Sequence, residues 1–355
     1  MITILDRYIA QRVMISTALV LGVLLALTVF FALVDALKDY GQANFGLYEM
    51  ARYVVLAQPR KIYEVFPVAT LIGALLGLST LAVSAELIAM RAAGVSVMQI
   101  IGSAIKAGLV FALLATALGE YVVPEAENQA QLGRAQALAR GVVQQRSGLW
   151  MRDKNTFVNV AEVLPDLSLR SVNIYSFEDE IQLRVHTRAE RATYVAPTGW
   201  RLEKVIESYV GNTGIKAKHL DSRFWETGLT QDVIGVFAVH PEQLSLQNLG
   251  QYIEHLERNG QSTERYRLVF WQKLFMPLAV IVMVLLATPF ALGQIRGGGL
   301  SRRIFAGVMI GLTFVVVSRS FGHFGLIYGI PPLLGAVLPI ALFYASALIL
   351  LRRSI

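Results

Sequence analysis

Residues 65–100 read VFPVATLIGALLGLSTLAVSAELIAMRAAGVSVMQI, an apolar run followed by a segment with one carboxylate and one guanidinium. The run over 65–83 is long enough to cross a hydrocarbon core of roughly 30 Å as a helix. Glu86 and Arg91 follow it, and a second apolar stretch begins near residue 103. The pattern predicts two membrane spans joined by a short polar connection.

The composition of the whole chain supports a membrane protein. Of 355 residues, 55% are hydrophobic and only 16% are charged, whereas soluble domains carry about 25% charged residues. The chain has no cysteine, which excludes disulfides, thiol nucleophiles and thiolate metal sites. Long windows with almost no charge predict six spans: 13–34, 65–83, 103–123, 268–292, 303–322 and 333–351. The first window is too long for a signal peptide, and no small-residue cleavage site follows it directly.

Basic residues set the predicted orientation. Loop 35–64 is mixed in charge, and the loop FGHFGLIYGIPP at 321–332 has no lysine, arginine or carboxylate. The opposite side of the predicted membrane carries Arg7, Arg12, Arg91, Lys106, Arg296, Arg302, Arg303, Arg352 and Arg353 against only Asp6 and Glu86. Because cytoplasmic segments are rich in lysine and arginine, both termini are predicted to be cytoplasmic. This bias explains the net charge of +7 without a nucleic-acid partner.

The insert over 124–262 is predicted to be a β domain outside the cytoplasm. Its apolar and polar residues alternate with period two, as in half-buried strands, for example Ile181, Leu183 and Val185 against Gln182, Arg184 and His186. Turn signals predict a small antiparallel sandwich: Pro165-Asp166, Glu178-Asp179-Glu180, Pro197-Thr198-Gly199 and Gly211-Asn212. The domains are therefore predicted as 1–123, 124–262 and 263–355.

An amphipathic helix is predicted to lead from the β domain back to the membrane. Ser245 precedes it as a cap, and the helix ends near Gly260. Its apolar stripe comprises Leu246, Leu249, Ile253 and Leu256.

The polar connection near 84–94 is predicted to be a short helix. Glu86 and Arg91 lie five positions apart and do not face each other on a helix, so a tight buried ion pair is not expected. Leu87 and Met90 lie three positions apart, and Gly94 is a suitable C-cap. A capped helix with an apolar patch around one carboxylate suits insertion into a groove of a soluble partner. The alternative is a surface loop whose charges only set the topology.

Nucleotide binding by this chain is not expected, because no G-x-x-x-x-G-K-[ST] loop occurs. If ATP drives transport, the ATPase is another polypeptide. The spans show no paired carboxylates, no H-E-x-x-H and no serine–base couple, which disfavours a membrane enzyme. A secondary transporter of another lipid remains an alternative, although neither intramembrane acidic relays nor inverted repeats are visible. The five histidines have no metal-ligand spacing.

Fragments along nearly the whole chain resemble the lipopolysaccharide export permeases of Gram-negative inner membranes, the LptF/LptG family. The resemblance is closer to the G-type subunit than to the F-type subunit, which is the nearest alternative. The fragments are LDRYI at 5–9, GALLGLSTLA at 73–82, SAELIAMRAAG at 84–94, GEYVVPEAE at 119–127, GLW at 148–150, RYRLVFWQKLFMPL at 265–278 and YGIPPLLGAVLP at 328–339.

The resemblance implies six transmembrane helices with an all-β periplasmic jellyroll between the third and fourth. It implies a non-enzymatic subunit that pairs with an F-type subunit and binds a dimeric cytoplasmic ATPase. ATP and Mg²⁺ belong to that ATPase, so no cofactor is expected in this chain. The complex would extract lipopolysaccharide from the outer leaflet and pass it to a single-span jellyroll partner.

The resemblance also implies site residues. The coupling-helix glutamate of the family falls on Glu86, with Leu87, Met90 and Arg91 beside it. Lys38 and Arg134 match basic positions near the lipid phosphates, whereas Ala32 and Asp39 depart from the basic pattern.

Three further residues are lipid candidates by position. Arg319 lies near the outer end of its span by helical rise and is expected to face a cavity or a partner, or to snorkel to the interface. Phe66 and Phe321 are candidates for lining an acyl-chain cavity, although aromatic residues in spans also serve as core or interface anchors. Gly73-x-x-x-Gly77 and Gly307-x-x-x-Gly311 predict close helix packing.

Overall fold

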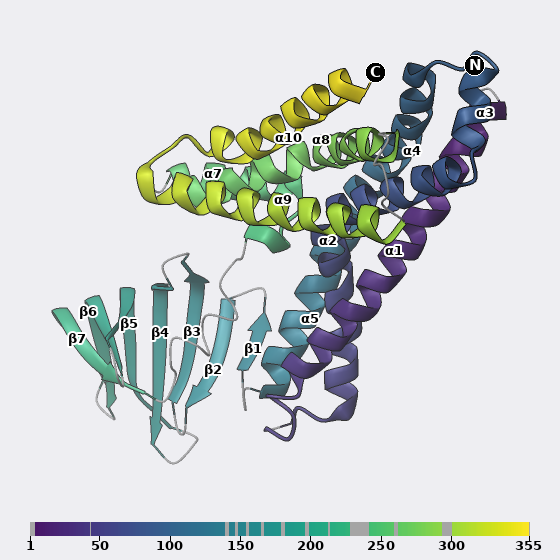
Figure 1. Ribbon diagram of the computed structural model, residues 1–355. Helices are drawn as coiled ribbons and strands as arrows, with labels where there is room; N and C mark the ends of the chain where they lie inside the picture. Colours follow the sequence, from purple (N-terminus) through teal and green to yellow (C-terminus); the bar gives the residue numbers. More distant parts are fainter. Residues whose placement is uncertain are drawn as a thin grey trace. The chain divides into compact units, whose positions relative to one another are not determined.

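The computed structural model describes residues 4–42, 44–138, 142–145, 148–153, 156–164, 167–178, 182–195, 199–211, 214–227, 241–258, 262–292 and 300–354 (Figure 1). They form two compact units, a helical unit over 1–32, 57–127 and 241–355 and a second unit over 33–56 and 128–240. Each unit is described by itself below.

Six helices among the described residues are long and apolar enough to cross a membrane. They contain all six predicted windows, which confirms the predicted spans. The helices are α1 (Ile4–Ala36), α2 (Leu47–Val83), α4 (Val97–Ala117) continued by α5 (Val123–Leu138), α8 (Glu264–Leu292), α9 (Leu300–Tyr328) and α10 (Pro332–Ser354).

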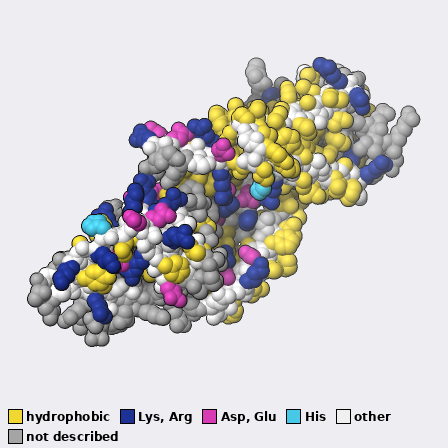
Figure 2. All heavy atoms as spheres, turned by 90° about the vertical axis from the view of Figure 1, so that its left-hand side faces the viewer, with side chains coloured by type: hydrophobic (Ala, Val, Ile, Leu, Met, Phe, Trp, Pro, Cys, Tyr) yellow, Lys and Arg dark blue, Asp and Glu magenta, His cyan; other side chains and the backbone are white. Residues whose placement is uncertain are grey.

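The core of the helical unit lies around α2 and α8. Their most apolar windows are 72% and 61% buried, against 11% for α1 and 17% for α9. Leu75 and Leu78 of α2 and Met283 of α8 belong to one large buried cluster. The outward faces of the helices remain apolar, as Figure 2 shows by the hydrophobic side chains that cover this part of the surface. Such faces are typical of helices surrounded by lipid or by another apolar subunit.

The glycine pairs make close helix contacts, as predicted. A Cβ atom at Gly73 would overlap the backbone Cα of Thr17 in α1, and one at Gly77 would lie 3.0 Å from the carbonyl oxygen of Arg12. Gly307 and Gly311 of α9 instead face side chains of α2. The first pair lets the backbones of α1 and α2 approach directly, and the second lets α9 lie against α2.

The third span does not stop where its apolar run stops. After α4 the chain forms a π-helical turn, η1 (Leu118–Val122), and continues as α5. A side chain at Gly119 would collide with the ring of Tyr63, so this close approach requires glycine. The predicted boundary at 123/124 thus falls within a continuous helix, because residues 125–138 are polar but are mostly good helix formers.

The β domain is an antiparallel sheet between the third and fourth spans. Its seven described strands pair in chain order: β1 (Val142–Gln145), β2 (Gly148–Asp153), β3 (Thr156–Val163), β4 (Leu169–Glu178), β5 (Gln182–Val195), β6 (Gly199–Gly211) and β7 (Gly214–Glu226). The predicted fold class, a six-span membrane protein with an inserted jellyroll-like β domain, is confirmed. The described strands belong to one sheet, however, and not to the two facing sheets of a sandwich, because each strand pairs with the next one in sequence.

The predicted turn residues Pro165, Asp166, Asp179, Glu180, Pro197, Thr198 and Asn212 lie outside the described residues. The strands on either side of each turn pair antiparallel, with Val163 opposite Leu169 and Gly211 opposite Gly214. The core of the sheet is apolar and centres on Trp200, which is fully buried and meets the ring of Tyr194 edge to face. Hydrophobic burial on one face therefore fixes the register of the strands.

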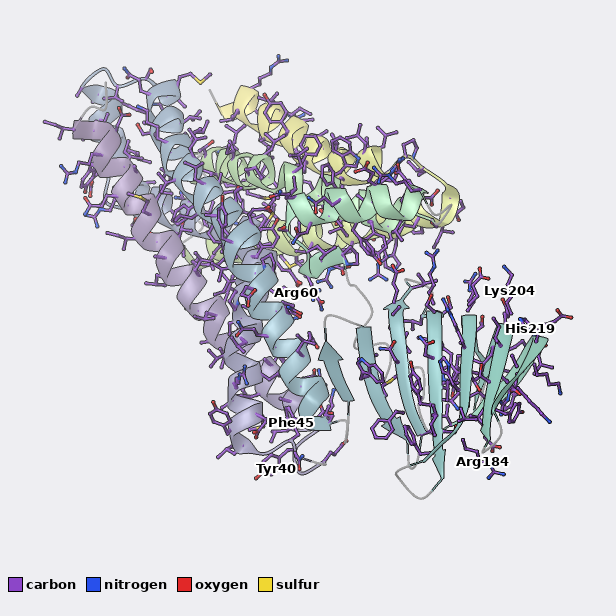
Figure 3. All side chains as sticks on the ribbon, turned by 180° about the vertical axis from the view of Figure 1, so that it is seen from behind. Tyr40, Phe45, Arg60, Arg184, Lys204 and His219 are labelled. Atoms are coloured by element: carbon purple, nitrogen blue, oxygen red, sulfur yellow. The ribbon has the colours of Figure 1, made fainter. Side chains whose placement is uncertain are left out.

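One residue pair is missing from the register of each of four successive strand pairs, β3–β4, β4–β5, β5–β6 and β6–β7. The missing pairs lie next to one another across the sheet. The residues without a registered partner there are Ala161, Ser171, Glu190, Lys204 and Asp221. Ser171 and Lys204 have positive φ angles of 49° and 50°, which is unusual for residues other than glycine. A hollow of about 620 Å³ lies along this row (the sheet seam). Lys204 and His219, labelled in Figure 3, are two of its lining residues.

The connecting helix forms as predicted. It is α7 (Leu246–Arg258), preceded by a 3₁₀ turn η2 (Pro241–Gln243). The amide of Asn248 donates a hydrogen bond of 3.2 Å to the hydroxyl of Ser245, which confirms the cap. Leu249 and Leu256 are fully buried and pack with Tyr266. The predicted end near Gly260 lies outside the described residues.

Candidate functional site

The polar connection between α2 and α4 is a short helix, α3 (Glu86–Ala92). Gly94 has a positive φ angle of 90°, and the amide of Val95 donates to the carbonyl oxygen of Met90 at 3.0 Å. This confirms Gly94 in the left-handed position that ends the helix. Ala85, immediately before the helix, also has a positive φ angle, of 61°.

Both oxygens of the Glu86 carboxylate accept hydrogen bonds within this chain. Tyr8 of α1 donates its hydroxyl to Oε2 at 2.7 Å, and Ser84 donates its hydroxyl to Oε1 at 2.9 Å. These two bonds, that from Tyr8 first, hold the pKa of the Glu86 carboxyl below its usual value. Arg12 in turn donates to the Tyr8 hydroxyl at 3.1 Å. The carboxylate is thus held by α1 and by the end of α2, and not by Arg91.

The other predicted coupling residues divide between core and surface. Leu87 is buried in the cluster that also contains α2 and α8 residues, and Met90 packs against that cluster. Arg91 is exposed, and Ile88 is the exposed large apolar side chain of α3. The apolar patch that the sequence suggested around Glu86 is therefore used for internal packing at Leu87, while Ile88 and Arg91 face outward.

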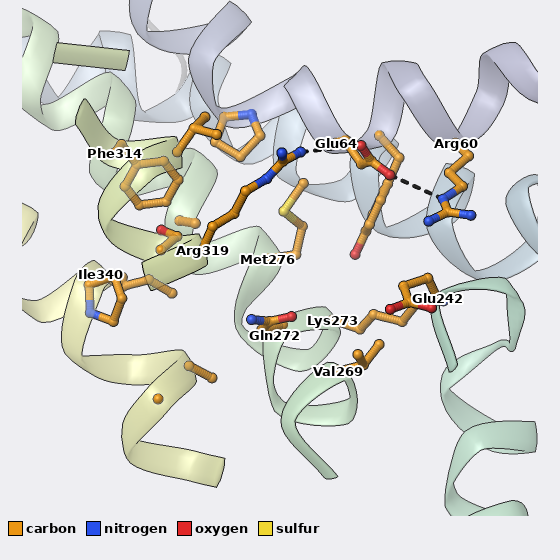
Figure 4. A pocket seen from close by; sticks show the side chains of 18 of the residues that line it. Arg60, Glu64, Glu242, Val269, Gln272, Lys273, Met276, Phe314, Arg319 and Ile340 are labelled. Atoms are coloured by element: carbon orange, nitrogen blue, oxygen red, sulfur yellow. Dashed lines mark hydrogen bonds and ion pairs between the residues drawn. The ribbon is translucent and has the colours of Figure 1, made fainter. Parts of the chain in front are cut away.

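A cavity of about 400 Å³ lies in the helical unit among α2, α8, α9 and α10 (Figure 4). Its charged lining residues are Arg60, Glu64, Glu242, Lys273 and Arg319, and its apolar lining includes Val269, Met276, Phe314 and Ile340. A cavity with one charged and one apolar part is suited to an amphiphilic molecule.

The charges in this cavity are only partly paired. Arg60 contacts Glu64 at 3.1 Å and Glu127 at 3.2 Å. Arg319 lies 4.0 Å from Glu64, and its side chain is 77% exposed. Lys273 donates to the backbone carbonyl of Leu244, next to η2. Of the two cavity arginines with a described ion pair, Arg60 and Arg319, Arg319 therefore has the longer contact with a carboxylate. Its guanidinium is accessible from the cavity.

The predicted aromatic residues occupy different environments. Phe66 is buried and meets the ring of Phe111 edge to face, with ring centroids 6.1 Å apart. It belongs to the helix core and not to the cavity lining. Phe321 is partly buried on α9 and does not line the described cavity either. Phe314, one turn before Ser318 on the same helix, does line it.

The remaining basic candidates belong to the second unit. Arg134 donates to Asp39 at 2.8 and 2.5 Å and to the hydroxyl of Tyr53 at 3.1 Å. Lys38 pairs with Asp35 at 2.8 Å, which raises the pKa of its amine, and its side chain is 73% exposed. Asp39 thus neutralises Arg134 locally, whereas Lys38 keeps an accessible amine.

Several site residues were missed at the sequence level. Tyr8 lies 78 positions from Glu86, and no sequence signal connects the two. Glu64 and Lys273 are isolated charges in or beside apolar runs, which is a usable signal because such residues normally face a cavity or a partner. The carboxylate of Glu120 accepts the amide of Leu246, 126 positions away, at 2.7 Å and caps α7.

Six membrane-length helices, an inserted β domain and an amphiphilic cavity among the helices define a polytopic membrane protein of the permease type. The family described as the lipopolysaccharide export system permease LptF/LptG matches residues 7–353, and the chain belongs to this family. Similar curated proteins are the lipopolysaccharide export system permease protein LptG of Escherichia coli (strain K12), 37% identical over 353 residues, with 99% of this chain and 98% of the relative covered. The protein of the same name from Haemophilus influenzae is 33% identical over 355 residues, with 99% of each chain covered. Both relatives are of the G type, in agreement with the closer resemblance expected from the sequence.

Proposed function

We propose that this chain is the G-type membrane subunit of an exporter that extracts lipopolysaccharide from the outer leaflet of the inner membrane. The single observation that carries the proposal, beside the family, is the cavity among α2, α8, α9 and α10. It places the cations Arg60, Lys273 and Arg319 next to the apolar side chains of Met276 and Phe314. An amphiphile with an anionic head group and acyl chains requires both kinds of surface.

The accessible cation of the cavity suits an anionic ligand. Three cations and two carboxylates line it, and Glu127, outside the lining, pairs with Arg60. Arg319 offers the most accessible positive charge, because its contact with Glu64 is 4.0 Å long and its side chain is 77% exposed. A guanidinium binds phosphate through two parallel charged hydrogen bonds, which are stronger than neutral ones. Lys38 offers a second accessible cation for a phosphate.

The proposal extends to partners and to orientation. The chain pairs with an F-type subunit, and ATP and Mg²⁺ are bound by a separate dimeric ATPase that docks at α3 through Glu86, Ile88 and Arg91. The charge bias of the sequence supports both termini in the cytoplasm and the β domain in the periplasm. The β domain passes the lipid to a single-span jellyroll partner.

The test is lipid capture by the reconstituted permease complex with photoreactive residues at Arg319 and Met276. Crosslinks to lipopolysaccharide are expected at both positions. Arg319→Gln is expected to lower extraction about fivefold to tenfold, because one partly hydrated charged hydrogen bond is lost. The matched control is Arg302→Gln, which removes an exposed arginine from the other end of α9. The absence of lipid crosslinks, or extraction without the ATPase, would contradict the proposal.

A further inference from the structure

We propose that Tyr8 is a positioning residue that holds the Glu86 carboxylate and ties α1 to α3, so that displacement of α3 is transmitted to the first span. The inference rests on the proposed function, in which an ATPase displaces α3. The observation that supports it is the 2.7 Å hydrogen bond from the Tyr8 hydroxyl to Oε2 of Glu86, which joins residues 78 positions apart.

The bond leaves Glu86 available to a partner. A carboxylate has about four acceptor sites on its two oxygens, and Tyr8 and Ser84 occupy one on each oxygen. Two sites remain for a cation of the partner, while the existing bonds fix the direction in which the carboxylate points. Glu86 is therefore both oriented and accessible. A long side chain without such bonds would lose rotamer freedom on docking.

Tyr8 is itself held in place. Arg12 donates to its hydroxyl at 3.1 Å, and the Arg12 guanidinium lies 5.2 Å from the centre of its ring. Two positions earlier, Asp6 accepts the hydroxyl of Ser103 at 2.6 Å and pairs with Lys106 at 2.7 Å. The start of α1 is thus bound to α3 through Tyr8 and to α4 through Asp6. This polar junction (Asp6, Tyr8, Arg12 and Glu86 with their partners) joins the start of α1 to both α3 and α4.

The geometry at the start of α3 agrees with a held junction. Ala85 has a positive φ angle of 61°, and a residue other than glycine keeps this conformation only where its surroundings enforce it. The bonds from Tyr8 and Ser84 to the adjacent Glu86 are contacts of that kind. Because α1 is one continuous helix of 33 residues, about 50 Å long at the usual rise, a change in tilt at Tyr8 moves its far end as well.

The experiment uses the complete complex with its ATPase in lipopolysaccharide-containing vesicles. The measured quantity is lipopolysaccharide extracted per ATP hydrolysed, for wild type, Tyr8→Phe, Glu86→Ala and the double variant. Tyr8→Phe keeps the ring and removes only the hydroxyl, and Tyr344→Phe, at an exposed tyrosine of α10, is the matched control. Assembly is checked by copurification of the ATPase.

Tyr8→Phe is expected to assemble normally and to extract roughly fivefold less lipid per ATP, since one hydrogen bond to a partly buried charged group is lost. The double variant is expected to be no worse than Glu86→Ala, because both changes remove the bond between Tyr8 and Glu86. In Tyr8→Phe the decline of this ratio on acidification should begin at a higher pH than in wild type. A packing role of the ring alone would not move this pH profile.

The outcomes separate the inference from the proposed function. A wild-type complex that extracts no lipopolysaccharide refutes the proposed function. Wild-type extraction together with a normal ratio and an unchanged pH profile in Tyr8→Phe refutes only the inference. Additive effects of Tyr8→Phe and Glu86→Ala refute it as well, because two residues that act through one shared bond would not give additive losses. A normal ratio in Glu86→Ala contradicts the coupling role of Glu86 and the inference with it.

Discussion

Replacement of Gly73 by alanine tests the helix packing most directly. A Cβ atom at this position would overlap both the backbone Cα and the hydroxyl of Thr17 in α1. Backbone cannot rotate away as a side chain can, so α1 and α2 must move apart. Overpacking of this kind costs about 1–3 kcal/mol, and we expect Gly73→Ala to lie at the upper end, near 3 kcal/mol.

The structure supplies a graded series with a matched control. At Gly77 the added carbon would lie 3.0 Å from backbone atoms of α1, so Gly77→Ala should cost about 1–2 kcal/mol. At Gly311 the nearest atom is a methyl carbon of Val68 at 2.6 Å, and a shift of that side chain should make the substitution milder. Gly22 has no neighbour within 4 Å, and Gly22→Ala should stabilise α1 by up to about 1 kcal/mol through helix propensity.

The assay is the midpoint of heat-induced loss of monodisperse protein in detergent, measured for all four variants at one scan rate. The expected order of midpoints is Gly73→Ala lowest, then Gly77→Ala, then Gly311→Ala, with Gly22→Ala at or above wild type. A midpoint for Gly73→Ala equal to that of Gly22→Ala would show that α1 and α2 do not pack through this glycine. The reasoning from the close approach would then be wrong.

Three further predictions concern the connecting helix, the β domain and the topology. Glu120→Ala should destabilise α7 by about 1 kcal/mol through loss of its cap, seen as faster hydrogen exchange at the Leu246 amide, whereas Glu120→Gln should retain most of the protection. Burial and the nearby Arg188 lower the pKa of His186, so the unfolded state binds more protons than the folded state. The β domain should therefore become easier to proteolyse as the pH falls below about 6.5. The variant His186→Asn should remove this pH dependence. A cysteine at Lys204, the only one in the chain, should react with an impermeant maleimide without disruption of the inner membrane, and protection there would overturn the periplasmic orientation.

The sequence was informative where a pattern depends on neighbouring residues. Apolar runs of sufficient length predicted every span, since a helix must satisfy its backbone internally to cross a membrane. The alternation of apolar and polar residues predicted the strands. Because each strand pairs with the next one in sequence, the order of the strands in the sheet follows from their order in the chain. The π-helical turn at 118–122 was not predicted, because it depends on how Gly119 packs against Tyr63 of another helix.

The candidate site was less predictable, because its contacts join distant parts of the chain. The position of Glu86 on a short capped helix was predicted, but its bond to Tyr8 depends on how α1 lies beside α3. Arg134 was expected near lipid phosphate, and in the structure it donates hydrogen bonds to Asp39, 95 positions away, and to Tyr53. Phe66 was a candidate cavity residue, and its ring packs against Phe111 instead. Side-chain direction within a span is set by tertiary packing, which periodicity alone does not encode.

The sheet seam has a mechanical consequence for the β domain. Pairing is interrupted along one transverse row through Ser171, Glu190, Lys204 and Asp221, and the ladder continues on both sides of it. A sheet bends most easily where its ladder is already interrupted, because fewer hydrogen bonds are distorted there. The row therefore acts as a bending line that divides the sheet into two stiffer parts. A change in the angle between the two parts alters the curvature of the whole sheet while the pairing inside each part stays intact.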